Sequence, residues 1–552
     1  QSTEAENLCE FVCATSEQLE DIPKSFKEAV TGKDKHKWIP SIKSELRSLI
    51  GNHTWDLVRK TKKMNLVSTK WVFKNKLNAD GTIRHKSRLV ARGFNQIKGK
   101  DWFKSYAPTL SLSSLRILLS LASKHKMHVH NVDITTAYLH GQVDTDIHLS
   151  IPEGFEPSTA VEEQIMRDGG CLRLNKALYG LVQAGYIWNR TFVKSLKSWE
   201  FRQLKTDPCI FVLDRQGRKL ILGIYVDDIL ACYNDKKDLD FFIEKLKADY
   251  KFKDLGPVQK CLGVEIERDF NGNFTIHQHS YLKILLEKFK IQPSKRAKTP
   301  ITNALDNCFP GEEPSESNAA SDFTIGTKFS KVDPTAYKSL LGALLYMAVA
   351  TRPDISYALS LLARFAAEPK KMHMDALLRL AKHLANTQDY RITYGKPSQG
   401  FVGYADASLA KEEGMKSTSG YFLSHCGGPV IWGAHKQKVL AHSIAEAEHM
   451  SLSQLGRDII YAKQLVTEMG FPVVGSIPVH EDCQPAIRIA ENPGFSRRSK
   501  SIRIAYHNIR DLVADGVIKL IHISGKSQPA DILTKPLGGP QTESCCRVLF
   551  AN

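Results

Sequence analysis

Two adjacent carboxylates lie where the sequence predicts the turn of a β-hairpin. Residues 220–225 and 229–232 are apolar runs typical of buried strands, and Asp227 and Asp228 stand between them. Neighbouring buried negative charges repel each other and lose hydration, so an apolar hairpin gains nothing structural from them. A divalent cation removes both penalties. The alternative is an ordinary Asp-containing turn.

A third carboxylate ends another predicted strand. Residues 128–133 alternate as a strand does, and Asp133 closes the run. One acid at a strand end, together with a distant aspartate pair on a hairpin, is the ligand set of a nucleotidyl-transfer site. Two Mg²⁺ ions about 3.5–4 Å apart at such a site activate a hydroxyl and stabilise the leaving pyrophosphate. Carboxylate oxygens suit this hard cation, with Mn²⁺ as a substitute.

A second set of acids follows in residues 401–535, where the predicted elements are three antiparallel strands and then alternating helices and strands. This order resembles that of ribonuclease H. The four acids that this fold would bring together are Asp406 on the first strand, Glu448 on the first helix, Asp482 at the end of the fourth strand and Asp531 at the start of the last helix. Such a set could hold two metal ions, with water attacking an RNA phosphodiester.

Glu446 competes with Glu448 for the position on the helix. The two side chains are separated by about 200° around a helix, so both cannot face one site. Residues 448–452 resemble the corresponding ribonuclease H helix, which favours Glu448.

The Tyr225–Asp228 box resembles the palm of reverse transcriptases, and its surroundings resemble the Ty1/copia class of LTR retrotransposon polymerases. The stretches that carry this resemblance are 69–74, 80–94, 106–108, 177–181, 254–256 and 351–355. The match runs in register from about Trp38 to Leu537. It implies a Pol polyprotein product with reverse transcriptase and ribonuclease H activities.

The resemblance also implies an α+β and α/β multidomain fold, a right-hand polymerase followed by a connection and a ribonuclease H domain. The expected parts are an N-terminal extension (1–35), fingers and palm (36–255), thumb and connection (256–395) with a flexible linker (303–328), ribonuclease H (396–537) and a C-terminal tail (538–552).

Four further residues receive roles from the resemblance. Tyr138 is expected to be a steric gate against the ribose 2′-hydroxyl, the group that distinguishes RNA from DNA. Lys86 and Arg88 are expected on the incoming triphosphate, with Arg92 as an alternative, since a guanidinium matches phosphate through its planar fork of donors. Gln183 is expected near the template and the nucleotide.

The composition fits a polyanionic partner. The 552 residues carry a formal charge of +17, with a pI of about 9.2 and basic clusters at 33–37, 59–63 and 497–500. Eleven cysteines without paired spacing favour reduced thiols over a zinc ribbon or a disulfide framework. No apolar run approaches the ~20 residues that span a bilayer, and no signal peptide opens the chain.

The expected partners are an RNA template, a DNA or tRNA primer, the RNA/DNA hybrid and dNTPs. A homodimer and integrase or capsid proteins are further candidates, and a membrane is not. The resemblance implies a cytoplasmic location within virus-like particles, with the nucleus as an alternative alongside the cDNA. Two rival functions stay open: a domesticated, non-catalytic nucleic-acid-binding subunit, and an RNA-templated RNA polymerase, which Tyr138 disfavours.

Overall fold

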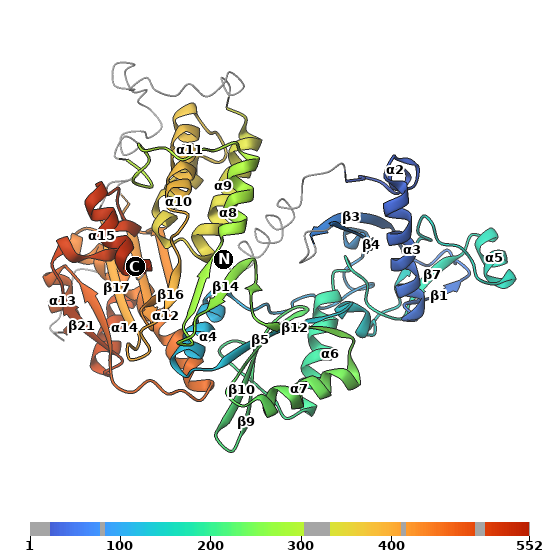
Figure 1. Cartoon of the computed structure of the whole chain (residues 1–552), viewed down its shortest axis with the longest axis horizontal. Helices are drawn as coiled ribbons and strands as arrows, with labels where there is room; N and C mark the ends of the chain where they lie inside the picture. The colour runs from blue at the N-terminus through green and yellow to red at the C-terminus, as the bar shows by residue number, and fades with distance from the viewer. Residues whose placement is uncertain (1–21, 78–82, 303–331, 410–415, 492–502, 551–552) are drawn as a thin grey trace.

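The computed structural model describes residues 22–77, 83–302, 332–409, 416–491 and 503–550. Most of the predicted N-terminal extension, the predicted linker 303–328 and the basic cluster 497–500 lie outside these residues. The described part is a mixed α/β assembly, with the hairpin β3–β4 toward one end of the long axis and the five-stranded sheet of β17 toward the other (Figure 1). None of the described helices is long and apolar enough to cross a membrane.

A six-stranded antiparallel sheet carries the Asp227–Asp228 turn. Its order is β12 (Phe252–Pro257), β5 (His128–Ile134), β11 (Asp228–Tyr233), β10 (Arg218–Tyr225), β9 (Ile210–Arg215) and β8 (Arg202–Gln203). Side chains alternate along the strands, so Leu220 and Leu222 join one apolar core while Ile221 joins another. The sheet is therefore covered on both faces, by α4 (Leu112–Lys124) on one and by α6 (Ala184–Ser198) with α7 (Lys236–Asp249) on the other.

Apolar residues at helical spacing predict a helix over 112–124 with Ser111 as its cap, and α4 has these bounds and this cap. The side chain of Ser111 accepts a hydrogen bond from the backbone N–H of Ser114, which satisfies one of the free donors at the helix start. Ten consecutive residues of α4, from Ser114 to Ser123, are buried. The helix is therefore covered on all sides, which matches its position between two sheets.

The N-terminal region has its own apolar core around Trp38, Trp71 and Phe73. Its elements are α2 (Phe26–Thr31), α3 (Lys35–Gly51), β1 (Trp55–Val58), β2 (Leu66–Val67), β6 (His148–Leu149), α5 (Ala160–Arg167) and β7 (Cys171–Leu174). The hairpin of β3 (Thr69–Leu77) and β4 (Ile83–Ala91) pairs Val72 with Arg88 and packs against α3. This hairpin presents the expected triphosphate ligands.

A helical region follows the six-stranded sheet. A small sheet of β13 (Lys260–Cys261), β14 (Val264–Arg268), β15 (Phe274–His277) and β16 (Ile392–Tyr394) lies beside α8 (His279–Lys288), α9 (Pro334–Ala350), α10 (Ser356–Leu362) and α11 (Lys371–Asn386). The sequence predicts one helix over 355–367. The structure divides this stretch into α10 and the 3₁₀ turn η6 (Ala363–Phe365).

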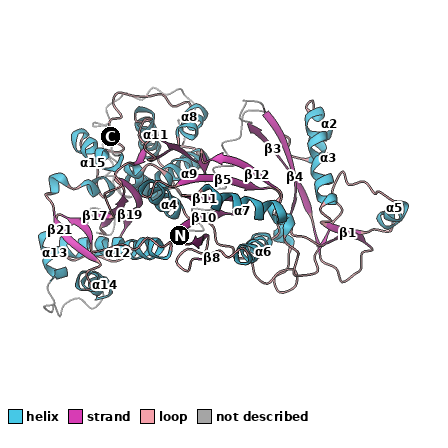
Figure 2. Cartoon of the chain, turned by 60° about the horizontal axis from the view of Figure 1, so that its bottom comes forward, coloured by secondary structure: helices cyan, strands magenta, loops and turns pink. Residues whose placement is uncertain are grey.

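The C-terminal sheet has the order β19 (Gly428–Lys436), β18 (Thr418–His425), β17 (Val402–Ser408), β20 (Ile477–Glu481) and β21 (Ile518–His522). The first three strands are antiparallel, and β17–β20 and β20–β21 are parallel, as expected for a ribonuclease H-like order. Helix α12 (Ile444–Glu468) packs on β17 and β18 and also contacts α13 (Gln484–Glu491) and α14 (Arg503–Ala514), as Figure 2 shows.

One expectation for the C-terminal region is wrong. The predicted last helix at Ala530 is a 3₁₀ helix, η9 (Pro529–Leu533), and the last α-helix is α15 (Gly539–Phe550). Helix α15 buries Cys545, Leu549 and Phe550, so the expected C-terminal tail is part of the core.

A buried arginine joins these regions. Arg116 on α4 donates to the carbonyl oxygens of Val430 (2.8 Å), Val349 (2.7 Å) and Ala350 (3.0 Å), and its guanidinium lies 3.8 Å from the ring centroid of Trp432. These acceptors belong to α9 and β19. One continuous core therefore extends through the six-stranded sheet, the helical region and the C-terminal sheet. None of the three forms a separate lobe.

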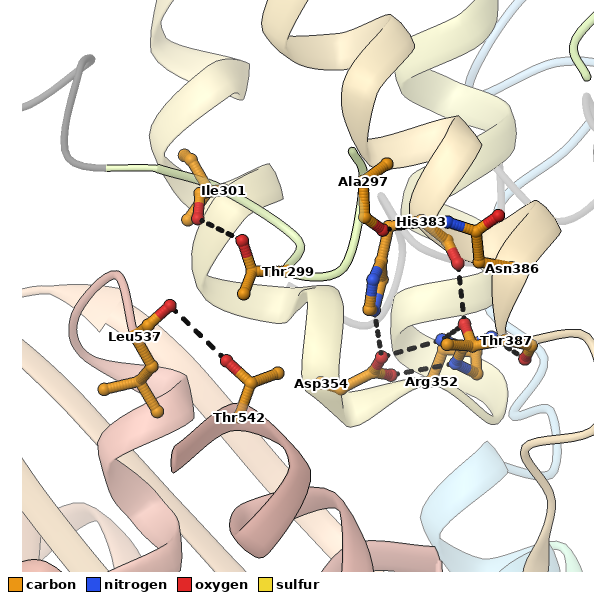
Figure 3. Close-up of polar contacts among 10 residues, drawn as sticks. All are labelled: Ala297, Thr299, Ile301, Arg352, Asp354, His383, Asn386, Thr387, Leu537 and Thr542. Carbon is orange, nitrogen blue, oxygen red and sulfur yellow. Dashed lines mark hydrogen bonds and ion pairs between the residues drawn. The ribbon is translucent and has the colours of Figure 1, made fainter. Parts of the chain in front are cut away.

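A second buried network lies at the break after α9. Arg352 donates to both carboxylate oxygens of Asp354, at 2.8 and 2.7 Å, and to the carbonyl and hydroxyl oxygens of Thr387, while Asp354 also meets His383 (Figure 3). The Arg352 guanidinium lies 5.6 Å from the ring centroid of Phe550 on α15. The predicted family stretch 351–355 thus ties α9, α11 and α15 together.

Candidate active sites

The first candidate site lies at the end of β5, β10 and β11. Strands β10 and β11 pair with Tyr225 opposite Asp228, and β11 pairs with β5 so that Asp228 lies opposite Asp133. Val226 occupies the tight turn with φ = 55°, in the left-handed region. Its carbonyl accepts from the Trp188 indole at 2.7 Å. The register therefore brings the three predicted acids to one edge of the sheet.

The surroundings of Asp227 are charged. Burial raises the pKa of Asp227 and the negative charge of Asp133 raises it further, whereas Arg88 and Lys86 act in the opposite direction. A buried carboxylate beside another carboxylate is stabilised by a nearby positive charge. Both predicted triphosphate ligands are thus close enough to this acid to influence its ionisation.

An aromatic ring connects the predicted nucleotide contacts. The Arg88 guanidinium lies 4.2 Å from the centroid of the Tyr179 ring, and the Tyr138 ring meets Tyr179 edge to face at 4.8 Å. Sequence reasoning missed Tyr179 as a site residue, although it lies within the family stretch 177–181. Its ring fixes Arg88 next to the expected gate.

Gln183 lies in the interior, next to the segment around Gln96. Its side chain is buried, its amide donates to the Asp101 carbonyl at 2.7 Å, and its side-chain oxygen accepts from Gln96 at 3.0 Å. The hydrogen bonds of this buried side chain thus hold the segment around Gln96 in place. The expected position of Gln183 near the template and the nucleotide stays a prediction.

The second candidate site is the closest gathering of acids in the described part of the chain. The ligand atoms of Asp406, Glu448 and Asp482 all lie within 4.8 Å of one another. Parallel pairing of β17 with β20 sets the two aspartates side by side, and α12 brings Glu448 above them. Burial raises the pKa of Glu448 well above its usual value, with the charges of Glu481 and Asp406 adding to the effect. Burial and Asp406 likewise raise the pKa of Asp482.

Asp531 lies next to this cluster and forms an ion pair with Lys535. The Lys535 ammonium lies 2.6 Å from one oxygen of Asp531 and 3.8 Å from an oxygen of Asp406. The Gln541 amide donates to the other oxygen of Asp531 at 2.7 Å. Burial and the charge of Asp406 still raise the pKa of Asp531 to about 7. Sequence reasoning missed Lys535, although four residues from Asp531 is a spacing at which side chains meet on a helical turn.

The two helix glutamates lie in different surroundings. Glu446 accepts a hydrogen bond from the backbone N–H of His442 at 2.6 Å and so closes the start of α12, whereas Glu448 joins the acid cluster. Glu481, the last residue of β20, is a further acid that the prediction missed. It is fully buried, and one of its oxygens accepts from the Cys483 N–H at 3.1 Å.

Comparisons with known proteins show which family this chain resembles. Residues 52–303 match the family described as reverse transcriptase (RNA-dependent DNA polymerase). The Pol polyprotein of transposon TNT 1-94 from Nicotiana tabacum is 33% identical over 531 residues, which are 95% of this chain and 38% of that protein. The chain thus spans about a third of the length of the Pol polyproteins that it matches.

A putative transposon Ty5-1 protein of Saccharomyces cerevisiae is 30% identical over 331 residues, which are 59% of this chain and 100% of that protein. Among solved structures, a foamy viral protease–reverse transcriptase bound to double-stranded DNA aligns with a TM-score of 0.41 and 12% identity, over 88% of this chain and 69% of the other. With a reverse transcriptase match over 52–303 and retrotransposon relatives along nearly its whole length, this chain belongs to the Ty1/copia family, as the reverse transcriptase region of a retrotransposon Pol polyprotein.

Proposed function

We propose that this chain synthesises DNA on RNA and DNA templates and cleaves the RNA strand of the resulting hybrid. The observation that carries the proposal is the presence of two separate acid sites on one shared core. Asp133, Asp227 and Asp228 form the first, and Asp406 with Glu448 belongs to the second. Each gathers carboxylates beside buried strands, where a structural role would favour apolar residues.

In this proposal the chain folds as a right hand. The hairpin β3–β4 and its surroundings act as fingers, the six-stranded sheet as the palm and the helical region as thumb and connection. The C-terminal sheet acts as the ribonuclease H unit. The partners are an RNA template with a DNA or tRNA primer, the RNA/DNA hybrid and dNTPs.

The acids fit Mg²⁺, or Mn²⁺ in its place, because both cations accept several carboxylate oxygens. A bound cation would offset the burial, and the repulsion between neighbouring acids, that raise the pKa of Asp227 and Glu448. The ions at the first site would be held by Asp133, Asp227 and Asp228. Those at the second site would be held by Asp406, Glu448 and Asp482, with Asp531 at the edge. Bound there, such ions supply the Lewis acidity that activates the attacking oxygen and stabilises the leaving group.

The other residues act on the nucleotide. Lys86 and Arg88 neutralise the triphosphate, and Tyr179 keeps the Arg88 guanidinium in place through its ring. Tyr138 stands beside that ring and excludes a nucleotide that carries a 2′-hydroxyl. At the second site the acids orient the attacking water and the scissile phosphate of the RNA strand.

Primer extension by three purified variants tests the proposal. A labelled DNA primer on a labelled RNA template is incubated with Mg²⁺ and dNTPs, with wild type, Asp228→Asn, Asp482→Asn and the exposed-residue control Asp389→Asn. We expect Asp228→Asn to lose primer extension only and Asp482→Asn to lose RNA cleavage only, while the control keeps both activities. If wild type binds the hybrid but neither extends nor cleaves it, the non-catalytic binding subunit takes the place of this proposal.

A further inference from the structure

A cavity lies where the second half of α12 meets the segment that joins β8 to β9. We call it the junction cavity, and its volume is about 650 Å³. Pockets of roughly 300–1,000 Å³ bind small organic ligands in proteins. The lining residues that matter here are Lys205, Ile460, Lys463, Gln464, Thr467 and Val517. The junction cavity is therefore large enough for a molecule of the size of a nucleotide.

Hydrogen bonds hold the two walls of the junction cavity together. The Glu468 carboxylate accepts from the backbone N–H of Lys205 at 2.8 Å, and from the N–H and the hydroxyl of Thr206 at 3.1 and 3.0 Å. The Arg202 guanidinium donates to the Glu468 carbonyl oxygen at 2.6 Å. Glu468 is the one acid among the described lining residues, and these bonds tie it to the wall. The cavity thus has a fixed frame.

Four polar side chains face the junction cavity without a partner in the described part of the chain. The ammonium groups of Lys205 and Lys463, the amide of Gln464 and the hydroxyl of Thr467 make no hydrogen bond or ion pair with the described residues. The three on α12 share one side of the helix, because side chains three and four residues apart are neighbours there. All four groups can donate hydrogen bonds and two are positively charged, which suits a phosphate.

An apolar surface completes the lining. Ile460 precedes Lys463 by one helical turn, and Val517 lies directly before β21. Both side chains are half-buried and pack against the main core, so each still presents some apolar surface to the cavity. Phosphate donors beside an apolar surface match a molecule that has both a phosphate and a flat ring.

The junction cavity is separate from both acid sites. Lys463 follows Glu448 by fifteen residues on α12, which is about 22 Å at a rise of ~1.5 Å per residue. Strand β8, which precedes Lys205, lies three strands from β11 in the six-stranded sheet, roughly 14 Å at a spacing of ~4.8 Å. A ligand in this cavity is therefore not the substrate of either site.

From these observations we propose that the junction cavity binds a free nucleoside phosphate, with its phosphates on Lys205 and Lys463 and its ring against Ile460 and Val517. Such a ligand touches both the β8–β9 segment and α12. Its binding therefore stabilises the junction of the six-stranded sheet with the C-terminal region. The inference goes beyond the proposed function and needs neither acid site.

Binding of a fluorescent nucleotide, methylanthraniloyl-dATP, to the full chain tests the inference. EDTA is present and primer–template is omitted, because nucleotide binding at the first site requires both metal and template in the proposed function. Fluorescence anisotropy at fixed salt gives each Kd. Unlabelled dATP, deoxyadenosine, inorganic triphosphate and a deoxyadenosine hexamer serve as competitors.

Two variants change the junction cavity in different ways. Lys205→Met/Lys463→Met removes its positive charges, whereas Gln464→Trp fills it and keeps the charges. The matched control is Lys283→Met/Lys298→Met, which removes two exposed lysines of the helical region. A further variant, Arg88→Met, removes the expected triphosphate contact of the first site.

We expect wild type, the control and Arg88→Met to bind the probe equally. Lys205→Met/Lys463→Met and Gln464→Trp should each raise Kd at least tenfold, about 1.4 kcal/mol. Unlabelled dATP should compete more strongly than the other three competitors, since it alone is a free molecule with both parts. It should also raise the Tm of wild type but not that of the two cavity variants, whose own melts show that they fold.

Gln464→Trp that binds as tightly as wild type would overturn the inference, because charge without the cavity would then hold the probe. Loss of binding in Arg88→Met would place the probe at the first site, and a wild type that binds no probe would leave the cavity without this ligand. Stronger competition by inorganic triphosphate or by the hexamer than by dATP would assign the cavity to a bare phosphate or to a nucleic-acid strand. All of these outcomes leave the proposed function standing, because primer extension tests it separately.

Discussion

Removing one partner of the buried Arg352–Asp354 pair should destabilise the region where α9, α11 and α15 meet. Arg352 is 2% exposed and Asp354 is 1% exposed, and two hydrogen bonds at 2.8 and 2.7 Å join them. In Asp354→Asn the guanidinium stays buried, loses its counter-charge and faces an amide nitrogen in place of one oxygen. Breaking a buried, hydrogen-bonded ion pair in this way costs about 3–5 kcal/mol.

Urea unfolding followed by tryptophan fluorescence measures this loss, with Asp389→Asn as a control because Asp389 is exposed. Unfolding of a chain of this size is compared by transition midpoints, since a single two-state free energy need not describe it. A double variant, Arg352→Met/Asp354→Leu, should recover part of the loss, because removing both charges leaves no unpaired ion.

The pKa of Asp354 determines how the predicted loss of stability depends on pH. Burial alone would raise the pKa of Asp354, but the charge and hydrogen bonds of Arg352, with His383, outweigh burial and hold it well below its usual value. A carboxylate with a depressed pKa stabilises the fold above its unfolded pKa of about 3.9 and loses this contribution as the pH falls through the folded value. The difference between wild type and Asp354→Asn should therefore be full at pH 7 and shrink below about pH 4. An Asp354→Asn protein as stable as the control at pH 7 would refute the reasoning.

Three further predictions concern single side chains. Tyr138→Ala should lower the preference for dNTPs over rNTPs by about tenfold or more in kcat/KM, since one pocket contact discriminates by roughly that factor; unchanged discrimination would remove Tyr138 from the gate. In an Asp228→Asn background, Lys535→Met should tighten Mn²⁺ binding measured by electron paramagnetic resonance. The Lys535 ammonium competes with the metal ion for Asp406, and a charge at about 4 Å contributes ~1 kcal/mol even in water. Equal Mn²⁺ affinity with and without Lys535 would refute this competition. Burial raises the pKa of Asp458 to about 6. Between about pH 4 and 6 the Asp458 carboxyl is therefore ionised in the unfolded state but protonated in the folded state. The stability of the fold falls as the pH rises across that window. Asp458→Asn should therefore gain about 1–3 kcal/mol at pH 7 and nothing at pH 4, as thermal melts at both pH values would show.

The local elements and the identities of the acids could be read from the sequence. Helix α4 was predicted with its cap, because apolar residues at helical spacing after a serine satisfy a short-range rule. The strands on either side of the Asp227–Asp228 turn followed from apolar runs of strand length. That Glu446 and Glu448 face different surroundings also followed locally, since residues two apart on a helix point to different sides.

The tertiary structure decided which of these residues meet. Asp133 faces Asp228 only because β5 pairs with β11 in one register, and that register depends on burial on both faces of the sheet. Glu481 and Lys535 became visible only when parallel strands and a 3₁₀ turn brought them to the acid cluster. Long-range packing, which no local pattern records, also buried Gln183.

Helix α12 likewise has one part that the sequence predicted and one part that tertiary contacts decide. The sequence predicted a helix over 445–455, and the structure continues it to Glu468. Its second half has distant partners: the Tyr461 hydroxyl lies 2.7 Å from that of Ser114 on α4, and Glu468 accepts from the backbone of Lys205 and Thr206. Residue types and spacing thus determined the chemistry available to the chain. Contacts between segments hundreds of residues apart decided where that chemistry is assembled, because burial and register are properties of the whole core.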